Sequence, residues 1–338
     1  MSNTQEGLYF SAYGAKPPSW PILHARNGRM MKTLLWLVKL AVSVGLMAWL
    51  VHRVDLAAVM THLRDVSVPM LVLAPLLMLL QALISGERWR QVMLGIGVSL
   101  PLGWLVRIHW VGAFINLLVP GSVGGDAYRM WQVHKRGVTL GTAVNGVMLE
   151  RIVTVLSLTV MVSALLPVLI PDVPGQWGFR LLAAASIGGI GGLMVLDRAP
   201  QALQGWRIVR GFAGLAEDTR RLFLSPRRAA LPLAWAFIGN ANLALVAFVF
   251  ARGLGADLGV VEALVLVPPV ILVTSLPISI SGWGTRELAM VTALGLAGVP
   301  EDIALTTSIL FGLTTLATSL PGGLLWVLNG RQPLETVT

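Results

Sequence analysis

Two arginines, Arg129 and Arg286, follow glycine-rich breaks in apolar sequence and have the chemistry to bind an anion. Both breaks share the pattern Pro-x-Ser-x-x-Gly-x-x-x-Arg, and the second, at Pro277, begins 157 residues after the first, at Pro120. Proline stops a helix and glycine permits a sharp turn, while arginine offers a planar fork of donors that matches phosphate. A duplicated break in membrane-spanning helices indicates the binding site of a transporter built from two related halves.

The residues around the breaks form the candidate binding site. A helix start carries unpaired N–H groups and a partial positive charge, so two starts that converge near the membrane midplane would attract an anion. We expect Asp126 and Thr285 to cap these helices. Besides the two arginines, the predicted phosphate-binding residues are Ser122, Ser279, Gly125, Gly282 and Asn116. Asn116 either lines the cavity or satisfies backbone groups that the break leaves free.

Each arginine also has a simpler interpretation. An arginine inside lipid costs about 2.5 kcal/mol or more, so two at matched positions suggest a function. Arg129 could instead anchor the chain at the membrane interface beside Lys135 and Arg136. Arg286 could instead form an internal ion pair with Glu287.

The carboxylates near the breaks could balance charge or carry protons. The candidates are Asp126, Glu150 and Glu287, with Arg151 as a partner. Asp126 is either a helix cap or a ligand and proton carrier. Glu150 either pairs with Arg151 at the membrane interface or reaches the cavity and balances the arginine charge.

Two further polar groups flank this region. Arg107 and His109 lie on the predicted short helix 103–119 and would suit the lining of a cavity. Glu87, Arg88 and Arg90 are expected to mark the cytoplasmic end of a span.

The composition fits an all-α polytopic membrane protein. Hydrophobic residues make up 55% of the 338, and charged residues only 12%, about half the share in a soluble domain. The net charge of +9 lies in loops and therefore reports topology, so no nucleic-acid partner is expected. The chain has no cysteine, and neither a metal nor another cofactor is expected.

The spans predict an inverted-repeat transporter architecture. A span needs about 20 apolar residues, and basic segments stay in the cytoplasm. Six full spans are predicted at 33–51, 68–85, 142–170, 180–196, 229–251 and 303–328. Two re-entrant broken-helix hairpins, 103–138 and 260–298, bring the total to about eight membrane segments. Alternatively, 103–119 and 260–276 cross the membrane fully.

The predicted halves, 33–170 and 180–328, enter the membrane from opposite sides. A polar cytoplasmic tail, 1–32, precedes them, an external loop, 171–179, joins them, and a cytoplasmic tail, 329–338, follows. The basic cytoplasmic loop 197–228 mixes arginines with apolar residues. It is either an amphipathic helix on an anionic leaflet or a charge cluster that sets topology, and the two are compatible.

The segments 114–129, Glu150-Arg151 and 276–287, taken in order, resemble the lysylphosphatidylglycerol synthase transmembrane region family, whose members are also described as flippase-like. In bifunctional members such a region moves an aminoacylated phospholipid between leaflets, and a separate soluble domain makes the lipid. Only ten polar residues follow the last predicted span, so the resemblance implies a stand-alone member without the synthase domain. It implies lipid handling without naming the lipid.

Together these observations predict a transporter in a bacterial-type inner membrane, with both termini cytoplasmic. Its expected substrate is an anionic phospholipid or polyprenyl-linked lipid that crosses through a central polar cavity. The sequence shows no recognised catalytic motif or Walker loop, and enzymatic activity is not expected. The alternatives are a membrane-embedded transferase acting on a lipid phosphate and a non-catalytic scaffold for a lipid-biosynthetic enzyme.

Overall fold

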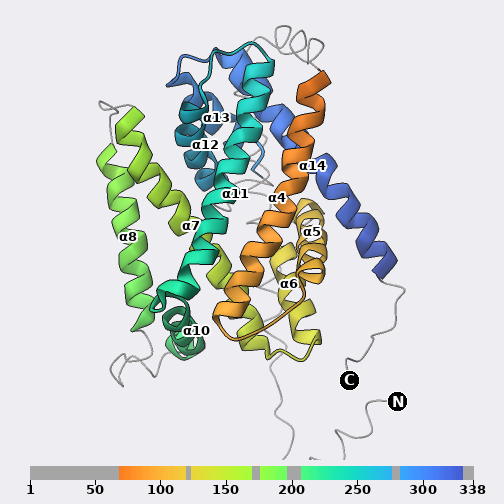
Figure 1. The fold of residues 1–338 in the computed structure, drawn as a ribbon, viewed down its shortest axis with the longest axis vertical. Helices are drawn as coiled ribbons and strands as arrows, with labels where there is room; N and C mark the ends of the chain where they lie inside the picture. Colours follow the sequence, from red (N-terminus) through yellow and green to blue (C-terminus); the bar gives the residue numbers. More distant parts are fainter. Residues whose placement is uncertain (1–67, 119–122, 170–175, 196–206, 276–281, 330–338) are drawn as a thin grey trace, which may run out of the picture. The chain divides into compact units, whose positions relative to one another are not determined.

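Long apolar stretches dictate helices in this chain, because a helix satisfies all its backbone groups internally. The computed structural model describes residues 68–118, 123–169, 176–195, 207–275 and 282–329, and these ranges are helical with short connections (Figure 1). In chain order the helices are α4 (Val68–Gly95), α5 (Leu102–Leu118), α6 (Gly124–Lys135), α7 (Leu140–Leu169), α8 (Gln176–Met194), α10 (Arg207–Phe223), α11 (Pro226–Gly253), α12 (Val260–Ser275), α13 (Thr285–Gly295) and α14 (Glu301–Asn329).

The described helices fit a polytopic membrane protein. Four of them are long and apolar enough to cross a membrane, at Pro69–Gly95, Leu140–Leu165, Pro226–Gly253 and Glu301–Leu328. They cover four of the six predicted full spans. The predicted span 180–196 falls on α8, whose apolar segment Ala183–Met194 is shorter, and the span 33–51 lies outside the described residues.

Helix lengths repeat along the chain. The series α4, α5, α6 and α7 has 28, 17, 12 and 30 residues, and the series α11, α12, α13 and α14 has 28, 16, 11 and 29. Helices α4 and α11 pack side by side and run in opposite directions (Figure 1). The predicted boundaries of the two halves, 33–170 and 180–328, stay predictions.

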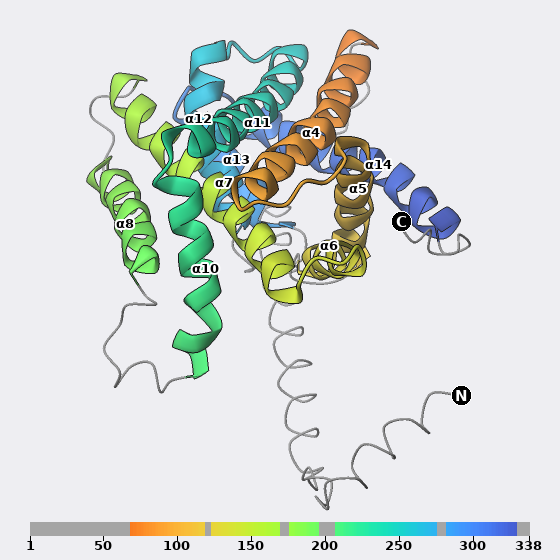
Figure 2. The same ribbon diagram turned by 60° about the horizontal axis from the view of Figure 1, so that its bottom comes forward.

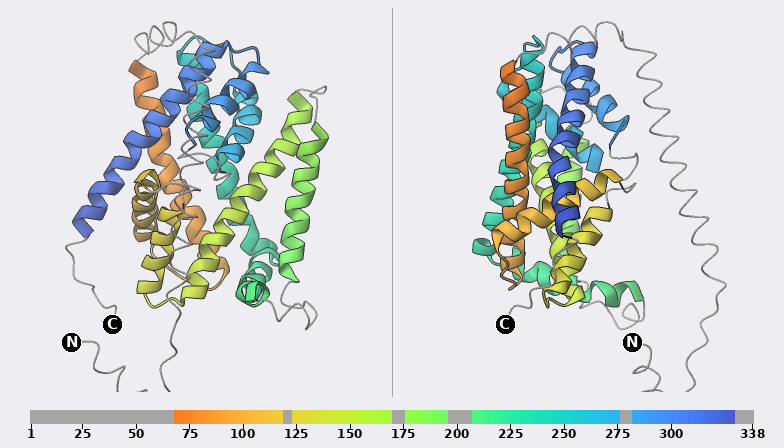
Figure 3. Two further views of the ribbon diagram at one scale, coloured as in Figure 1. Left: turned by 180° about the vertical axis from the view of Figure 1, so that it is seen from behind. Right: turned by 90° about the vertical axis from the view of Figure 1, so that its right-hand side faces the viewer.

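Each series contains a helical hairpin. The hairpin of α5 and α6 starts and ends at the end of the bundle where α4 stops, and the hairpin of α12 and α13 lies toward the opposite end (Figures 1 and 3). The segments that connect the two arms include residues outside the described ranges, 119–122 in the first hairpin and 276–281 in the second. Whether these hairpins are re-entrant in a membrane stays a prediction.

The buried core is divided between the two hairpins. One apolar cluster joins α4, α5, α6 and α7 around Trp89, Met93 and Leu149. The other joins α7, α11, α12, α13 and α14 around Leu266 and Met290. Each hairpin is therefore packed among longer helices, which is the setting that irregular backbone at membrane depth requires.

Helix α10 confirms a helix within the predicted basic loop 197–228. It packs against α7 and α8, on the side of the bundle away from α5 and α6 (Figure 2). Its apolar residues Leu215 and Leu222 are buried in the apolar cluster that contains Trp89 and Met93 of α4 and Leu149 of α7. The apolar face of this part of α10 therefore packs against other helices of the protein.

Helices α14 and α5 approach each other very closely. A Cβ on Gly322 would lie 2.3 Å from the carbonyl oxygen of Trp110, and one on Gly323 would lie 2.7 Å from the ring of Phe114. Only hydrogen at these two positions lets the helices meet, so glycine sets their separation.

Candidate functional site

Arg129 lies at the centre of a buried cluster of charges. It is on α6, is 5% exposed, and reaches Glu150 on α7, which is 3% exposed. Its two terminal nitrogens donate to Oε2 of Glu150 at 3.3 and 3.2 Å. Arg129 is therefore not an interfacial anchor, and that alternative is wrong. Glu150 likewise turns inward and pairs with Arg88 and Arg129, as the alternative in which it balances arginine charge predicted.

A second arginine completes the pairing of Glu150. Nε of Arg88, on α4, donates to Oε1 of Glu150 at 2.8 Å, and Nη2 donates to the same oxygen. Arg88 is 7% exposed, so the expectation that it marks a span end is wrong. Its neighbours Glu87 and Arg90 pair with each other at 3.0 Å in a less buried position.

Asp126 connects Arg129 to a third arginine. Its Oδ2 accepts a hydrogen bond of 2.5 Å from Nε of Arg151, and its Oδ1 lies 3.4 Å from Nη1 of Arg129. Helix α6 begins at Gly124, and its N-cap residue is Val123, which makes no capping hydrogen bond with its side chain. The prediction that Asp126 caps this helix is wrong, because its carboxylate is used by two arginines.

The cluster of Arg88, Asp126, Arg129, Glu150 and Arg151 has an excess positive charge. Three guanidinium groups face two carboxylates, which leaves a formal charge of +1. The guanidinium of Arg129 lies 4.1 Å from the centre of the Trp89 ring, a cation–π contact, and its buried Nε has no hydrogen-bond partner among the described residues. We call these five residues the Arg129 cluster.

Arg286 lies in a smaller, neutral cluster. Its Nε and Nη2 donate to Oε1 of Glu287 at 3.1 and 2.5 Å, and Nε lies 3.3 Å from Oγ of Ser308 on α14. The Trp283 ring stacks on the guanidinium at 4.6 Å. A Cβ on Gly312 would lie 2.1 Å from Nη2 of Arg286, so this glycine makes room for the guanidinium. The internal ion pair with Glu287 is thus the alternative that the structure shows.

The two arginines differ in their position along the helix. Arg286 is the second residue of α13, whereas Arg129 is the sixth residue of α6 and lies in the second turn. The connection before α13 is longer, and it ends in Gly282 and Gly284, whose φ angles are +79° and +83°. Arg286 therefore lies in the first turn of its helix, and Arg129 lies about one turn further along its own.

Side chains of the protein already bind N–H groups at both helix starts. The N–H of Gly125 donates to Oδ1 of Asn116 at 2.7 Å, so Asn116 binds a backbone group next to the break, and its predicted role in phosphate binding stays a prediction. The N–H of Gly284 donates to Oε2 of Glu287 at 2.6 Å. Thr285 does not cap α13, since its hydroxyl donates to the carbonyl of Gly282. These N–H groups are therefore not free to bind an anion in this state.

The remaining predicted residues are distributed as follows. Gly125 packs so closely on α5 that a Cβ there would lie 2.1 Å from the carbonyl oxygen of Gly112. Pro120, Ser122, Pro277 and Ser279 lie outside the described residues.

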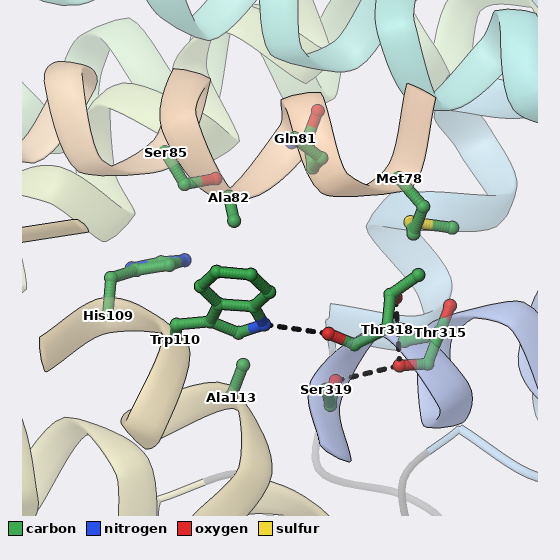
Figure 4. A pocket seen from close by; sticks show the side chains of 10 residues that line it. All are labelled: Met78, Gln81, Ala82, Ser85, His109, Trp110, Ala113, Thr315, Thr318 and Ser319. Carbon is green, nitrogen blue, oxygen red and sulfur yellow. Dashed lines mark hydrogen bonds between the residues drawn. The ribbon is translucent and has the colours of Figure 1, made fainter. Parts of the chain in front are cut away.

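A cavity of about 120 Å³ with polar side chains in part of its lining lies between α4, α5 and α14 (Figure 4), and we call it the polar cavity. Gln81 and Ser85 on α4 face Thr315, Thr318 and Ser319 on α14. The cavity is also lined by Met78, Ala82, His109, Trp110 and Ala113. His109 therefore lines a cavity, as its position on the predicted short helix 103–119 indicated. No residue on α4 or α14 was singled out for this cavity from the sequence.

Comparison with known proteins agrees with this arrangement of apolar helices around buried charge. Residues 36–322 match the family model described as the lysylphosphatidylglycerol synthase TM region. The chain belongs to this family. Comparison with curated proteins gave no significant match.

Membership of the lysylphosphatidylglycerol synthase TM region family identifies an integral membrane protein of a lipid-related family. The matched range includes the Arg129 cluster, the Arg286 pair and the polar cavity. The site residues described above therefore belong to the part of the chain that defines the family.

Proposed function

We propose that this chain moves an anionic lipid between membrane leaflets without changing it covalently. The headgroup would cross through the protein at buried cationic groups, and the hydrocarbon chains would stay in the bilayer. Such a protein would act in a bacterial-type inner membrane, with both termini in the cytoplasm.

The observation that carries this proposal is the excess positive charge of the Arg129 cluster. Charged side chains at membrane depth are costly and commonly mark pathways for ions or substrates. Four of the five charged side chains are less than 10% exposed, whereas that of Arg151 is 43% exposed, so the cluster extends from the interior to a partly open position. A single negative charge, such as a lipid phosphate, would neutralise the cluster.

Arg129 is the arginine best placed to accept that phosphate. Arg88 and Arg151 hold Glu150 and Asp126 through contacts of 2.8 and 2.5 Å, whereas Arg129 contacts the same carboxylates at 3.2 to 3.4 Å. Charge-assisted hydrogen bonds of this type are normally about 2.7–2.9 Å long, so Arg129 is the more loosely held guanidinium. Its Nε is a donor without an acceptor among the described residues.

Arg286 would contribute less to phosphate binding than Arg129. Glu287 neutralises it through two short contacts, and Trp283 covers its face. Binding of a phosphate here would require the carboxylate of Glu287 to leave. Asp126, Glu150 and Glu287 are the groups that could couple such an exchange to protons.

The test is lipid transfer in vesicles that contain the purified full chain. Arg129→Ala should lower transfer of a fluorescent phosphatidylglycerol about tenfold or more, equivalent to about 1.4 kcal/mol. Arg129→Lys should restore only part of it, because a point charge replaces a planar fork. Arg252→Ala, which removes an exposed arginine paired with Asp257, is the matched control.

Three results would contradict the proposal. Unchanged transfer in the Arg129→Ala, Arg286→Ala double variant would exclude these arginines from the route. A new lipid product detected by mass spectrometry would indicate a transferase. Neither transfer nor product in the wild-type chain would indicate a scaffold.

A further inference from the structure

The apolar surface between α4 and α5 contains a groove next to the polar cavity. The groove has a volume of about 310 Å³, near the lower limit of about 300 Å³ for typical small-molecule sites. It is lined by Leu76, Leu79, Leu80, Ala82, Leu83, Val106 and Trp110. Leu76, Leu80 and Leu83 are exposed at the surface of the bundle, where lipid chains would surround a membrane helix.

The groove and the cavity meet at two residues. Ala82 on α4 and Trp110 on α5 line both spaces. Nε1 of Trp110 donates to the carbonyl of Thr318 on α14 at 2.7 Å, which fixes the ring at the junction (Figure 4). The small side chain of Ala82 faces this ring across the opening. One molecule could therefore occupy both spaces.

The cavity has room for a small headgroup and polar atoms in part of its lining. Its volume of about 120 Å³ is well above the roughly 10–15 Å³ that one water needs. Hydroxyls of Ser85, Thr315 and Ser319 and the amide of Gln81 lie among apolar side chains that make up most of the lining. The hydroxyls of Thr315 and Ser319 donate to backbone carbonyls of α14, and their oxygens could still accept a hydrogen bond from a polar headgroup.

The charges behind the cavity favour an anion. Nδ1 of His109 is buried and has no hydrogen-bond partner among the described residues. Its helix, α5, packs against α4 and α6, which carry Arg88 and Arg129. These arginines act electrostatically on the His109 ring and Glu150 opposes them, so the Arg129 cluster is near this wall of the cavity.

We propose that the cavity and the groove together bind one anionic amphiphile, with its headgroup at His109 and one hydrocarbon chain between α4 and α5. This site would be a lateral entry from the bilayer, one step before the Arg129 cluster. The inference rests on the proposed function and deepens it, since it names where the lipid enters and which charge the headgroup carries.

Photo-labelling of the full chain in vesicles tests this site directly. The probe is a phosphatidylglycerol with a photoactivatable group on one acyl chain, compared with a phosphatidylcholine that carries the same chain. Phosphatidylglycerol should label peptides containing 76–83 and 106–110 about tenfold more than phosphatidylcholine, a preference of about 1.4 kcal/mol. An excess of soluble glycerol phosphate should not displace it, since the chain contributes to binding.

Variants at the junction separate this site from general contact with lipid. Ala82→Trp should fill the opening and abolish the preferential labelling. Leu73→Trp places the same side chain on an exposed position of α4 outside the groove and should leave labelling unchanged. His109→Gln, which removes the imidazole without filling the opening, should reduce the preference for phosphatidylglycerol, and this result does not depend on whether Ala82→Trp folds.

Several outcomes would overturn the inference. They are equal labelling by the two lipids, unchanged labelling in both Ala82→Trp and His109→Gln, or complete displacement by glycerol phosphate. Lipid transfer measured in the same vesicles distinguishes the two proposals. Preferential labelling without any transfer refutes the proposed function and leaves the site intact, whereas full transfer in an unlabelled Ala82→Trp variant refutes only the entry site.

Discussion

Replacing Glu150 with glutamine tests the reasoning about the Arg129 cluster most directly. The change keeps the size of the side chain and removes one negative charge. Glu150 accepts two contacts from Arg88 and two from Arg129, so Glu150→Gln leaves two buried guanidinium groups without their shared carboxylate. The formal charge of the cluster rises from +1 to +2.

The expected loss of stability follows from the burial of all three partners. Removing one member of a buried ion pair typically costs about 3–5 kcal/mol. At about 2–4 °C per kcal/mol for a domain of 150–250 residues, the melting temperature should fall on the order of 10 °C. The assay is thermal unfolding of the purified chain in detergent, with the wild type measured alongside.

Glu217→Gln is the matched control for this variant. Glu217 pairs with Arg221 at 2.7 Å on α10, and both side chains are more than half exposed. An exposed helical pair of this kind contributes about 0.3–0.5 kcal/mol. If Glu150→Gln unfolds at the same temperature as Glu217→Gln, the Arg129 cluster does not hold the helices together as described.

Two further predictions concern packing and pH. Gly125→Ala should lower the free energy of unfolding by about 1–3 kcal/mol, because its Cβ would meet the carbonyl of Gly112 at 2.1 Å, whereas Gly103→Ala, with open space around it, should be neutral or stabilising in the same denaturation assay. Burial raises the pKa of the Asp218 carboxyl above its ordinary value, although a hydrogen bond from Asn145 opposes this shift. The charged carboxylate therefore destabilises the folded protein at pH values above the pKa of the folded state. This destabilisation disappears as the pH falls below the pKa of the unfolded state. Asp218→Asn should therefore raise the melting temperature at neutral pH, and the gain should vanish near pH 3; an equal gain at both pH values would contradict this assignment.

The sequence predicted the chemistry of the site better than its geometry. Apolar stretches gave the four long spans, and Glu150, Asp126, Arg129 and Arg151 were all identified as candidates before their pairing was known. Which carboxylate meets which arginine depends on how α6 packs against α7. The position of α6 also depends on its close contact with α5, where Gly125 meets Gly112, and no local pattern reveals that contact.

Arg88 was wrongly predicted to mark the end of a span because it lies between two other charged residues in the sequence. Glu87 and Arg90 pair with each other in a less buried position, and the three together look like the polar end of a span. The signal that could have identified Arg88 is its spacing, seven residues after Gln81 and three after Ser85. This spacing places all three on one face of α4, directed into the bundle.

The duplicated motif was a partial guide to the two arginines. In the motif, Arg129 and Arg286 occupy equivalent sequence positions. The connection before α13 is longer than the one before α6, so α13 begins later relative to the motif. Arg286 consequently lies beside Glu287 and Ser308, and Arg129 lies one turn deeper between two carboxylates. The shared sequence pattern therefore did not give the two arginines the same structural environment.

The glycine contact between α14 and α5 limits how this protein can change shape. With backbone at Gly322 resting against backbone at Trp110, neither helix can slide or rotate without carrying the other. Any rocking motion would move them as one rigid body, together with the wall of the cavity that they share. The cavity would then open or close where α4 meets the α5–α14 unit, as that unit moves relative to α4.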